Sequence, residues 1–147
     1  MGLRNNYKTD AAAEVEGVWI DVDINEHNRK PIKVKLSRMG QSNKAYTKAL
    51  EERTRPHTAA IQAETLDNEL GRSIMRDVFV DTILLSWENL PKSELTGVDT
   101  DTDDLPFNRE NAIALFDELP DFYDVCETHA KKTANFRNAT RTKTSKN

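Results

Sequence analysis

The chain has 147 residues, of which 37% are hydrophobic and 31% charged, with one cysteine and a net charge of −4. This length predicts one domain with its own core, and a single cysteine cannot form an internal disulfide, so a reducing cytosol fits best. No apolar run reaches the roughly 18 residues that cross a bilayer, so no membrane-spanning helix is expected. Residues 61–120 carry four Lys/Arg against fourteen Asp/Glu. This acidic middle argues against a nucleic-acid binder, which needs a coherent basic face.

The amino-terminal region predicts an arm followed by a β-hairpin. Residues 1–14 are polar and without periodic pattern, so we expect a mobile arm. In residues 17–37 two runs alternate between apolar and polar side chains on either side of the connection NEHNRKP, which is typical of a hairpin. A lone hairpin is marginal in water, so its apolar face must dock on helices or on another chain. Trp19 lies on the polar side, either as an exposed partner anchor or packed under the arm or a helix.

The remainder of the predicted domain, residues 15–137, shows helical patterns. Cap residues and apolar side chains at three- and four-residue spacing predict helices over about residues 43–55, 65–88, 108–118 and 120–137. Pro56 predicts a break after the first of these. Residues 138–147 lack core-forming side chains and are expected to be disordered. The predicted fold class is therefore α+β, mostly α-helical, with an N-terminal β-hairpin packed on a helical core.

The loop between the predicted helices 65–88 and 108–118 contains a candidate calcium site. Asp99, Asp101, Asp103 and Glu110 fall at the carboxylate positions of a calcium-binding loop. Asp104, however, stands where the sharp turn of such a loop needs glycine. The pattern favours a solvated acidic loop ahead of a helix N-terminus.

Two further groups of residues have structural explanations. Asp21 and Asp23 lie near His27, but on a hairpin they share the polar face with lysines, and opposite charges pair across strands. Cys126 and His129 are three residues apart on an apolar stripe, and no second Cys/His group completes a zinc set. We therefore expect no catalytic, cofactor-binding or metal-binding residues and no enzymatic activity.

The stretches KLSRMGQSNKAY, TLDNELGRSIMRDVFVDTILLSWENL and LPFNRENAIALFDELPDFYD resemble the tail assembly chaperones of long-tailed, siphovirus-like bacteriophages. The resemblance covers about residues 15–138 and rests on the order of the pieces. It implies a non-enzymatic factor of the host cell cytoplasm that binds the tape measure protein, keeps it soluble and helps recruit tail tube subunits. Such proteins are often also made in a longer, frameshifted form, and they have no catalytic residues to carry over.

We expect the partner to be contacted by Trp19, Val34, Leu36 and Tyr46, and self-association is left open. A tape measure helix exposes apolar stripes, which a chaperone would cover with apolar grooves beneath a charged outer surface. The alternative is a structural virion component of the tail or the head–tail junction, which would share the small α+β build. An enzyme is a distant third, because it would need a metal at the acidic loop and no general base stands out.

Overall fold

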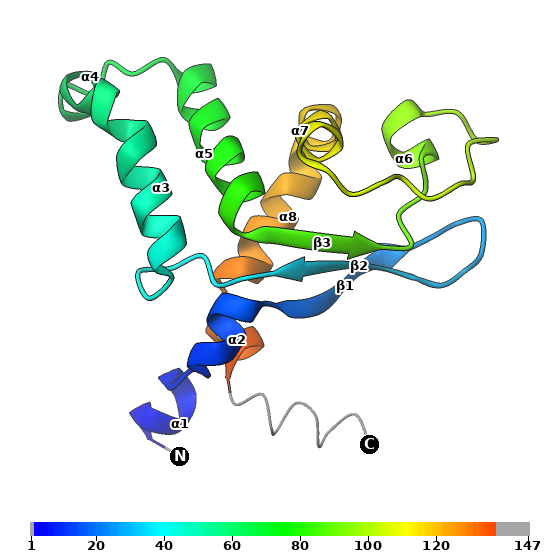
Figure 1. The fold of residues 1–147 in the computed structure, drawn as a ribbon, viewed down its shortest axis with the longest axis horizontal. Coiled ribbons are helices and arrows are strands. Elements are labelled where there is room, and N and C mark those ends of the chain that lie inside the picture. The colour runs from blue at the N-terminus through cyan, green and yellow to red at the C-terminus, as the bar shows by residue number, and fades with distance from the viewer. Residues whose placement is uncertain (1, 138–147) are drawn as a thin grey trace.

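The computed structural model describes residues 2–137 as a three-stranded antiparallel sheet with a layer of helices on one face (Figure 1). The strands are β1 (Val18–Ile24), β2 (Pro31–Leu36) and β3 (Leu84–Glu88), with β2 in the centre. The α-helices are α1 (Leu3–Tyr7), α2 (Ala11–Glu16), α3 (Lys44–Thr54), α4 (Thr58–Gln62), α5 (Asn68–Thr82), α6 (Ser93–Thr96), α7 (Arg109–Glu118) and α8 (Pro120–Lys131), and the 3-10 turns are η1 (Arg55–His57) and η2 (Thr133–Phe136). The predicted fold class, α+β and mostly helical, is confirmed. The predicted disordered tail, 138–147, lies outside the described residues.

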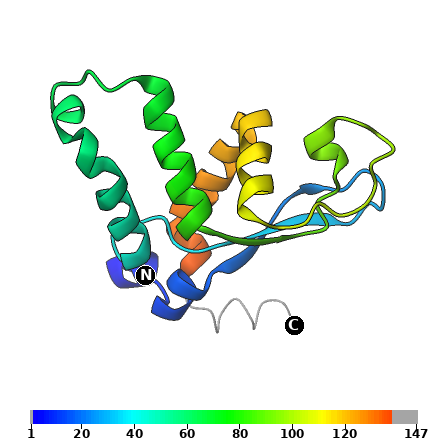
Figure 2. The same cartoon turned by 45° about the horizontal axis from the view of Figure 1, so that its top comes forward.

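The predicted hairpin is confirmed. Strands β1 and β2 pair antiparallel, with Ile20 opposite Val34 and Trp19 opposite Lys35. Because side chains alternate along a strand, Ile20 and Val34 face the helices, whereas Trp19 faces away from them. The apolar face of the hairpin therefore docks on the chain's own helices α5, α7 and α8, which Figure 2 shows side by side above the sheet.

Strand β3 is the main departure from the sequence prediction, which extended one helix over residues 65–88. Helix α5 ends at Thr82, and the chain then pairs with β2, placing Trp87 opposite Val34. A short apolar run fits a buried helix or a buried strand equally well. Pairing with the open edge of β2 decides between them, because it satisfies backbone groups that would otherwise be buried without partners. Trp87 is buried, and its indole N–H donates to the carbonyl of Leu105 at 2.8 Å.

The amino-terminal segment also differs from the prediction of a mobile arm over residues 1–14. Its described part contains α1 and the start of α2, which is capped because the Asp10 carboxylate accepts from two amides of the first turn. Ala13 and Glu14 are buried. The backbone N–H of Asp10 donates to the carbonyl of Phe136 at 2.7 Å. This segment is thus docked against the carboxyl-terminal turn η2.

Helix α5 is fixed to the helical layer by a cluster of aromatic rings. Phe79 is fully buried and meets Phe116 of α7 and Tyr123 of α8 edge-on, at centroid distances of 5.8 and 5.1 Å. Edge-to-face pairs add to the energy of apolar burial. The carboxyl-terminal half of α5 is therefore part of the core.

Two other helices begin at asparagine caps. The side chains of Asn43 and Asn108 accept from amides in the first turns of α3 and α7.

Candidate functional site

A broad open groove separates the first half of α5 from α7 and α8. Its volume is about 1160 Å³. Met75 and Tyr123 provide partly exposed apolar surface, with the buried Phe116 beneath them, and Leu66 lies at the end beside the start of α5. Pockets for small molecules span about 300–1,000 Å³ and enclose most of the ligand. The size and openness of this groove, called the α5–α8 groove below, suit a segment of polypeptide better.

The groove exists because the first half of α5 projects beyond the core. The fully buried residues of α5 are Val78, Phe79 and Val80, all at its carboxyl end. The first turns rise away from the sheet beside α3 (Figure 1), and Leu70 there is 38% exposed. The Asp67 carboxylate accepts from the Leu70 N–H. These turns are therefore capped, although the rest of the fold does not bury them.

The rim of the α5–α8 groove is strongly acidic. Its charged side chains are Asp67, Glu69, Asp117, Asp121, Asp124 and Glu127, against Arg72 and Arg76. Six carboxylates against two guanidinium groups leave a net charge of −4. The groove therefore combines an apolar floor with a rim that attracts cations.

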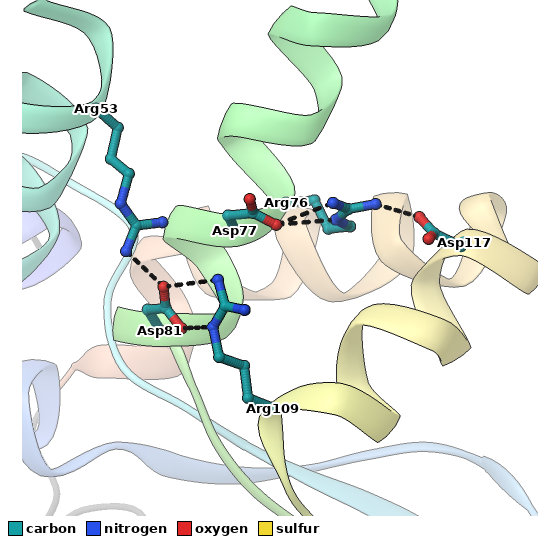
Figure 3. A network of polar contacts seen from close by, with 6 residues as sticks. All are labelled: Arg53, Arg76, Asp77, Asp81, Arg109 and Asp117. Carbon is teal, nitrogen blue, oxygen red and sulfur yellow. Dashed lines mark hydrogen bonds and ion pairs between the residues drawn. The ribbon is translucent and has the colours of Figure 1, made fainter.

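One of the two rim arginines is already committed to ion pairs, as Figure 3 shows. Arg76 bonds Asp77 on its own helix at 3.0 Å and also Asp117 of α7. Burial lowers the pKa of Arg76, but the hydrogen bonds to Asp117 and Asp77 outweigh burial, so its pKa is raised and the side chain stays cationic. This contact ties α5 to α7 across one end of the groove and leaves Arg72 as the unpaired cation among the described lining residues.

A second ion-pair set holds the base of α5 between α3 and α7 (Figure 3). Asp81 accepts from Arg53 of α3 at 2.5 Å and from Arg109 of α7 at 2.8 Å. Burial raises the pKa of Asp81, but the hydrogen bonds from Arg109 and Arg53 outweigh it, and the pKa lies below its ordinary value. The shared carboxylate fixes the direction in which the projecting half of α5 leaves the core.

Comparison with known families places the molecule in a phage context. Residues 41–147 match the model of the YdaY prophage protein family, which is more than half of the chain. The chain belongs to this family. The match to YdaY prophage proteins includes α3 to α8 and thus every lining residue of the α5–α8 groove, whereas β1 and β2 precede it. No curated protein and no solved structure shows significant similarity to this member of the YdaY family.

The four residues that the sequence suggested as partner contacts do not gather in one place. Trp19 is 38% exposed on the outer face of the sheet, with the Lys35 ammonium 6.0 Å from its ring. Tyr46 of α3 is half-buried against the core, and burial raises the pKa of its hydroxyl. Val34 and Leu36 are 0% exposed. The expectation for these two is corrected, because their side chains face the helical layer and lie in the core beneath it.

Sequence reasoning missed the groove, and the main apolar stripe of this region does not mark it. Of Leu66, Leu70 and Val78, only Leu66, which precedes α5, is among the lining residues. Met75, which widens that stripe, is the apolar side chain that α5 itself contributes to the described lining, and a wide stripe serves more than one neighbour. The rest of the α5 wall is mostly polar, so it carries no periodic apolar signal.

The residues weighed as metal ligands are not brought together. Within residues 2–137, no group of three or more His, Cys, Asp or Glu side chains is placed to hold a metal ion. In the acidic loop, Asp101 instead accepts from the Thr96 hydroxyl at 2.6 Å. Asp21 lies opposite Lys33 across the hairpin, which is the expected cross-strand neighbour.

Cys126 lies on the core side of α8, as expected, whereas His129 is only partly buried. Cys126 is 0% exposed, and burial raises the pKa of its thiol to about 12. Because the thiolate is the reactive form, this thiol is inert at neutral pH. Burial and the nearby Lys132 lower the pKa of His129.

No helix in the described part of the chain is long and apolar enough to cross a membrane.

Proposed function

We propose that this prophage protein is a tail assembly chaperone, which binds the tape measure protein in the host cell cytoplasm, keeps it soluble and helps recruit tail tube subunits without catalysis. Membership of a prophage family supports the phage setting. The ordered likeness of three sequence stretches to tail assembly chaperones supports the class. The observation that carries the proposal is the α5–α8 groove, whose apolar floor and acidic rim suit a helical partner.

The partner segment we infer is an amphipathic helix with lysine or arginine beside its apolar stripe. An α-helix with its side chains is about 10–12 Å across, and helices commonly bind by laying an apolar face into such a groove. Its stripe would cover Met75 and Tyr123, of which methionine adapts readily to different side chains. Its cations would meet the carboxylates of the rim, which mainly raises the association rate and the specificity.

A groove of this kind accounts for both parts of the chaperone role. Covering an apolar stripe removes the surface through which long helices aggregate. Each bound copy adds a net charge of −4, and like-charged assemblies stay apart. Many copies on one long partner would hold it by avidity although each site is weak. Weak single sites also allow displacement by tail tube subunits.

Co-expression with the tape measure protein tests the proposal. The soluble fraction of the tape measure protein after centrifugation is measured without the chain, with the wild-type chain and with a Glu69→Lys/Asp124→Lys variant. We expect the wild type to raise this fraction several-fold and the variant to lose most of that gain, because it reverses two rim charges.

Glu52→Lys/Glu110→Lys is the matched control. It makes the same change in net charge outside the groove, and Glu110, like Glu69, lies in the first turn of its helix. The control should solubilise the tape measure protein as the wild type does. A tape measure protein that is equally soluble without the chain would refute the proposed function. Persistence of the chain in purified virions, measured by mass spectrometry, would indicate a structural component of the tail or head–tail junction instead.

A further inference from the structure

A second, smaller hollow lies where α7 turns into α8, and we call it the corner pocket. Its volume is about 350 Å³, and it is lined by strands β1 and β2, helix α6 and the α7–α8 corner. Val22, Leu119 and Phe122 provide its accessible apolar surface, above the buried Ile32 and Leu115. This volume is at the lower end of the range for small-ligand pockets, so it suits one large side chain and not a whole helix.

The charged groups around the corner pocket are all carboxylates. They are Asp23, Glu94, Glu118 and Asp121, and no lysine, arginine or histidine is among the lining residues. No ion pair within residues 2–137 involves any of the four. Burial raises the pKa of Glu94, and the neighbouring Glu26 and Asp23 raise it further, while His27 lowers it. The pocket thus holds negative charge that the described part of the chain does not neutralise.

These features identify the chemistry of an occupant. A metal ion needs several oxygen ligands that converge on one point, and no such group is found among the described residues. An apolar floor beneath separated carboxylates instead matches a side chain with an aliphatic stem and a cationic head, which is the build of lysine and arginine. Charge complementarity and apolar shape therefore select the same occupant.

We propose that the corner pocket binds a lysine or arginine side chain of a protein partner, with its stem on Val22, Leu119 and Phe122 and its cation between Glu94 and Glu118. The inference rests on the proposed function only in that the partner is a protein. Pro120 and Asp121 line both the corner pocket and the α5–α8 groove. One partner segment in the groove can therefore also place a basic side chain in the pocket. The partner would then need a lysine or arginine at a fixed position in that segment.

A titration with single amino-acid derivatives tests this inference without any tape measure protein. The probes are N-acetyl-lysine methylamide and its uncharged analogue N-acetyl-norleucine methylamide, each followed by amide chemical shifts of the ¹⁵N-labelled chain. We expect the lysine derivative to shift the amides of Val22, Leu119 and Phe122, with a dissociation constant in the millimolar range typical of so few atoms. The norleucine derivative should bind roughly fivefold more weakly or worse.

Glu94→Gln/Glu118→Gln should weaken binding of the lysine derivative by roughly fivefold and leave norleucine binding unchanged. Glu69→Gln/Asp124→Asn, on the neighbouring groove, is the matched control and should bind lysine as the wild type does. The same spectra report whether each variant is folded. Equal binding of the two derivatives, no shifted amides at the pocket, or wild-type binding by Glu94→Gln/Glu118→Gln would each overturn the inference. A failed co-expression test leaves this result standing, and a failed titration leaves the groove proposal standing.

Discussion

Phe79 is a central side chain of the helical layer, and Phe79→Ala should destabilise the protein strongly. The ring is 0% exposed and meets two other rings edge-on. Removing a buried phenylalanine costs about 3–5 kcal/mol, and the loss of two aromatic pairs places this site in the upper half of that range. Domains are stable by about 5–15 kcal/mol in total, so the variant loses a large share. The melting temperature should fall by about 10–15 °C.

Urea denaturation followed by far-UV circular dichroism measures this loss. Phe107→Ala is the matched control, because Phe107 is 37% exposed and makes a single edge-on contact, with Trp87 at 4.9 Å. We expect the control to lose about 1 kcal/mol. If Phe79→Ala does not fold, Phe79→Leu should still lose about 1–2 kcal/mol. A Phe79→Ala midpoint no lower than that of Phe107→Ala would refute the packing argument.

Three further substitutions test other parts of the fold. Trp87→Phe leaves the Leu105 carbonyl without its donor. It should lower the free energy of unfolding by about 1–3 kcal/mol, measured by urea denaturation. An unchanged midpoint would mean that this hydrogen bond contributes nothing to stability. Gly17→Ala should destabilise the protein more than Gly97→Ala in the same assay. Both glycines have positive φ, but only at Gly17 would an added Cβ meet another side chain, at 2.6 Å from Cδ1 of Leu85. Equal losses of stability would contradict this close approach. Because the pKa of Asp81 is lowered in the folded state, its ion pairs stabilise the protein above the ordinary carboxyl pKa of about 3.9 and are lost as pH falls through the folded value. The stability gap between wild type and Asp81→Asn should therefore be constant from pH 7 to about 5 and narrow below about 4, and a gap that widens in acid would contradict this.

Local signals in the sequence were enough to predict the hairpin and the capped helices. An alternating pattern defines β1 and β2, and the side chains of Asn43 and Asn108 mark where α3 and α7 begin. These features depend on neighbours in the chain, so they can be read without knowing the tertiary structure.

The failures all depend on contacts that are distant in the chain. The apolar run after Thr82 becomes a strand because the edge of β2 is available to it. The helices packed on the sheet in turn bury Val34 and Leu36, which an isolated hairpin would expose on one face. The described part of the arm is ordered by a hydrogen bond to Phe136, more than a hundred positions further along the chain. The α5–α8 groove was missed for the same reason, since it depends on how α5 lies beside α7 and α8.

Hydrogen exchange of the chain, alone and bound to a soluble helical segment of the tape measure protein, tests the central claim most directly. We predict slower exchange in peptides covering residues 68–76 of α5 and 121–127 of α8, the walls of the α5–α8 groove. The outer face of the sheet around Trp19 should exchange as in the free chain. Slower exchange confined to β1, with α5 and α8 unchanged, would contradict the assignment of the groove as the partner-binding site.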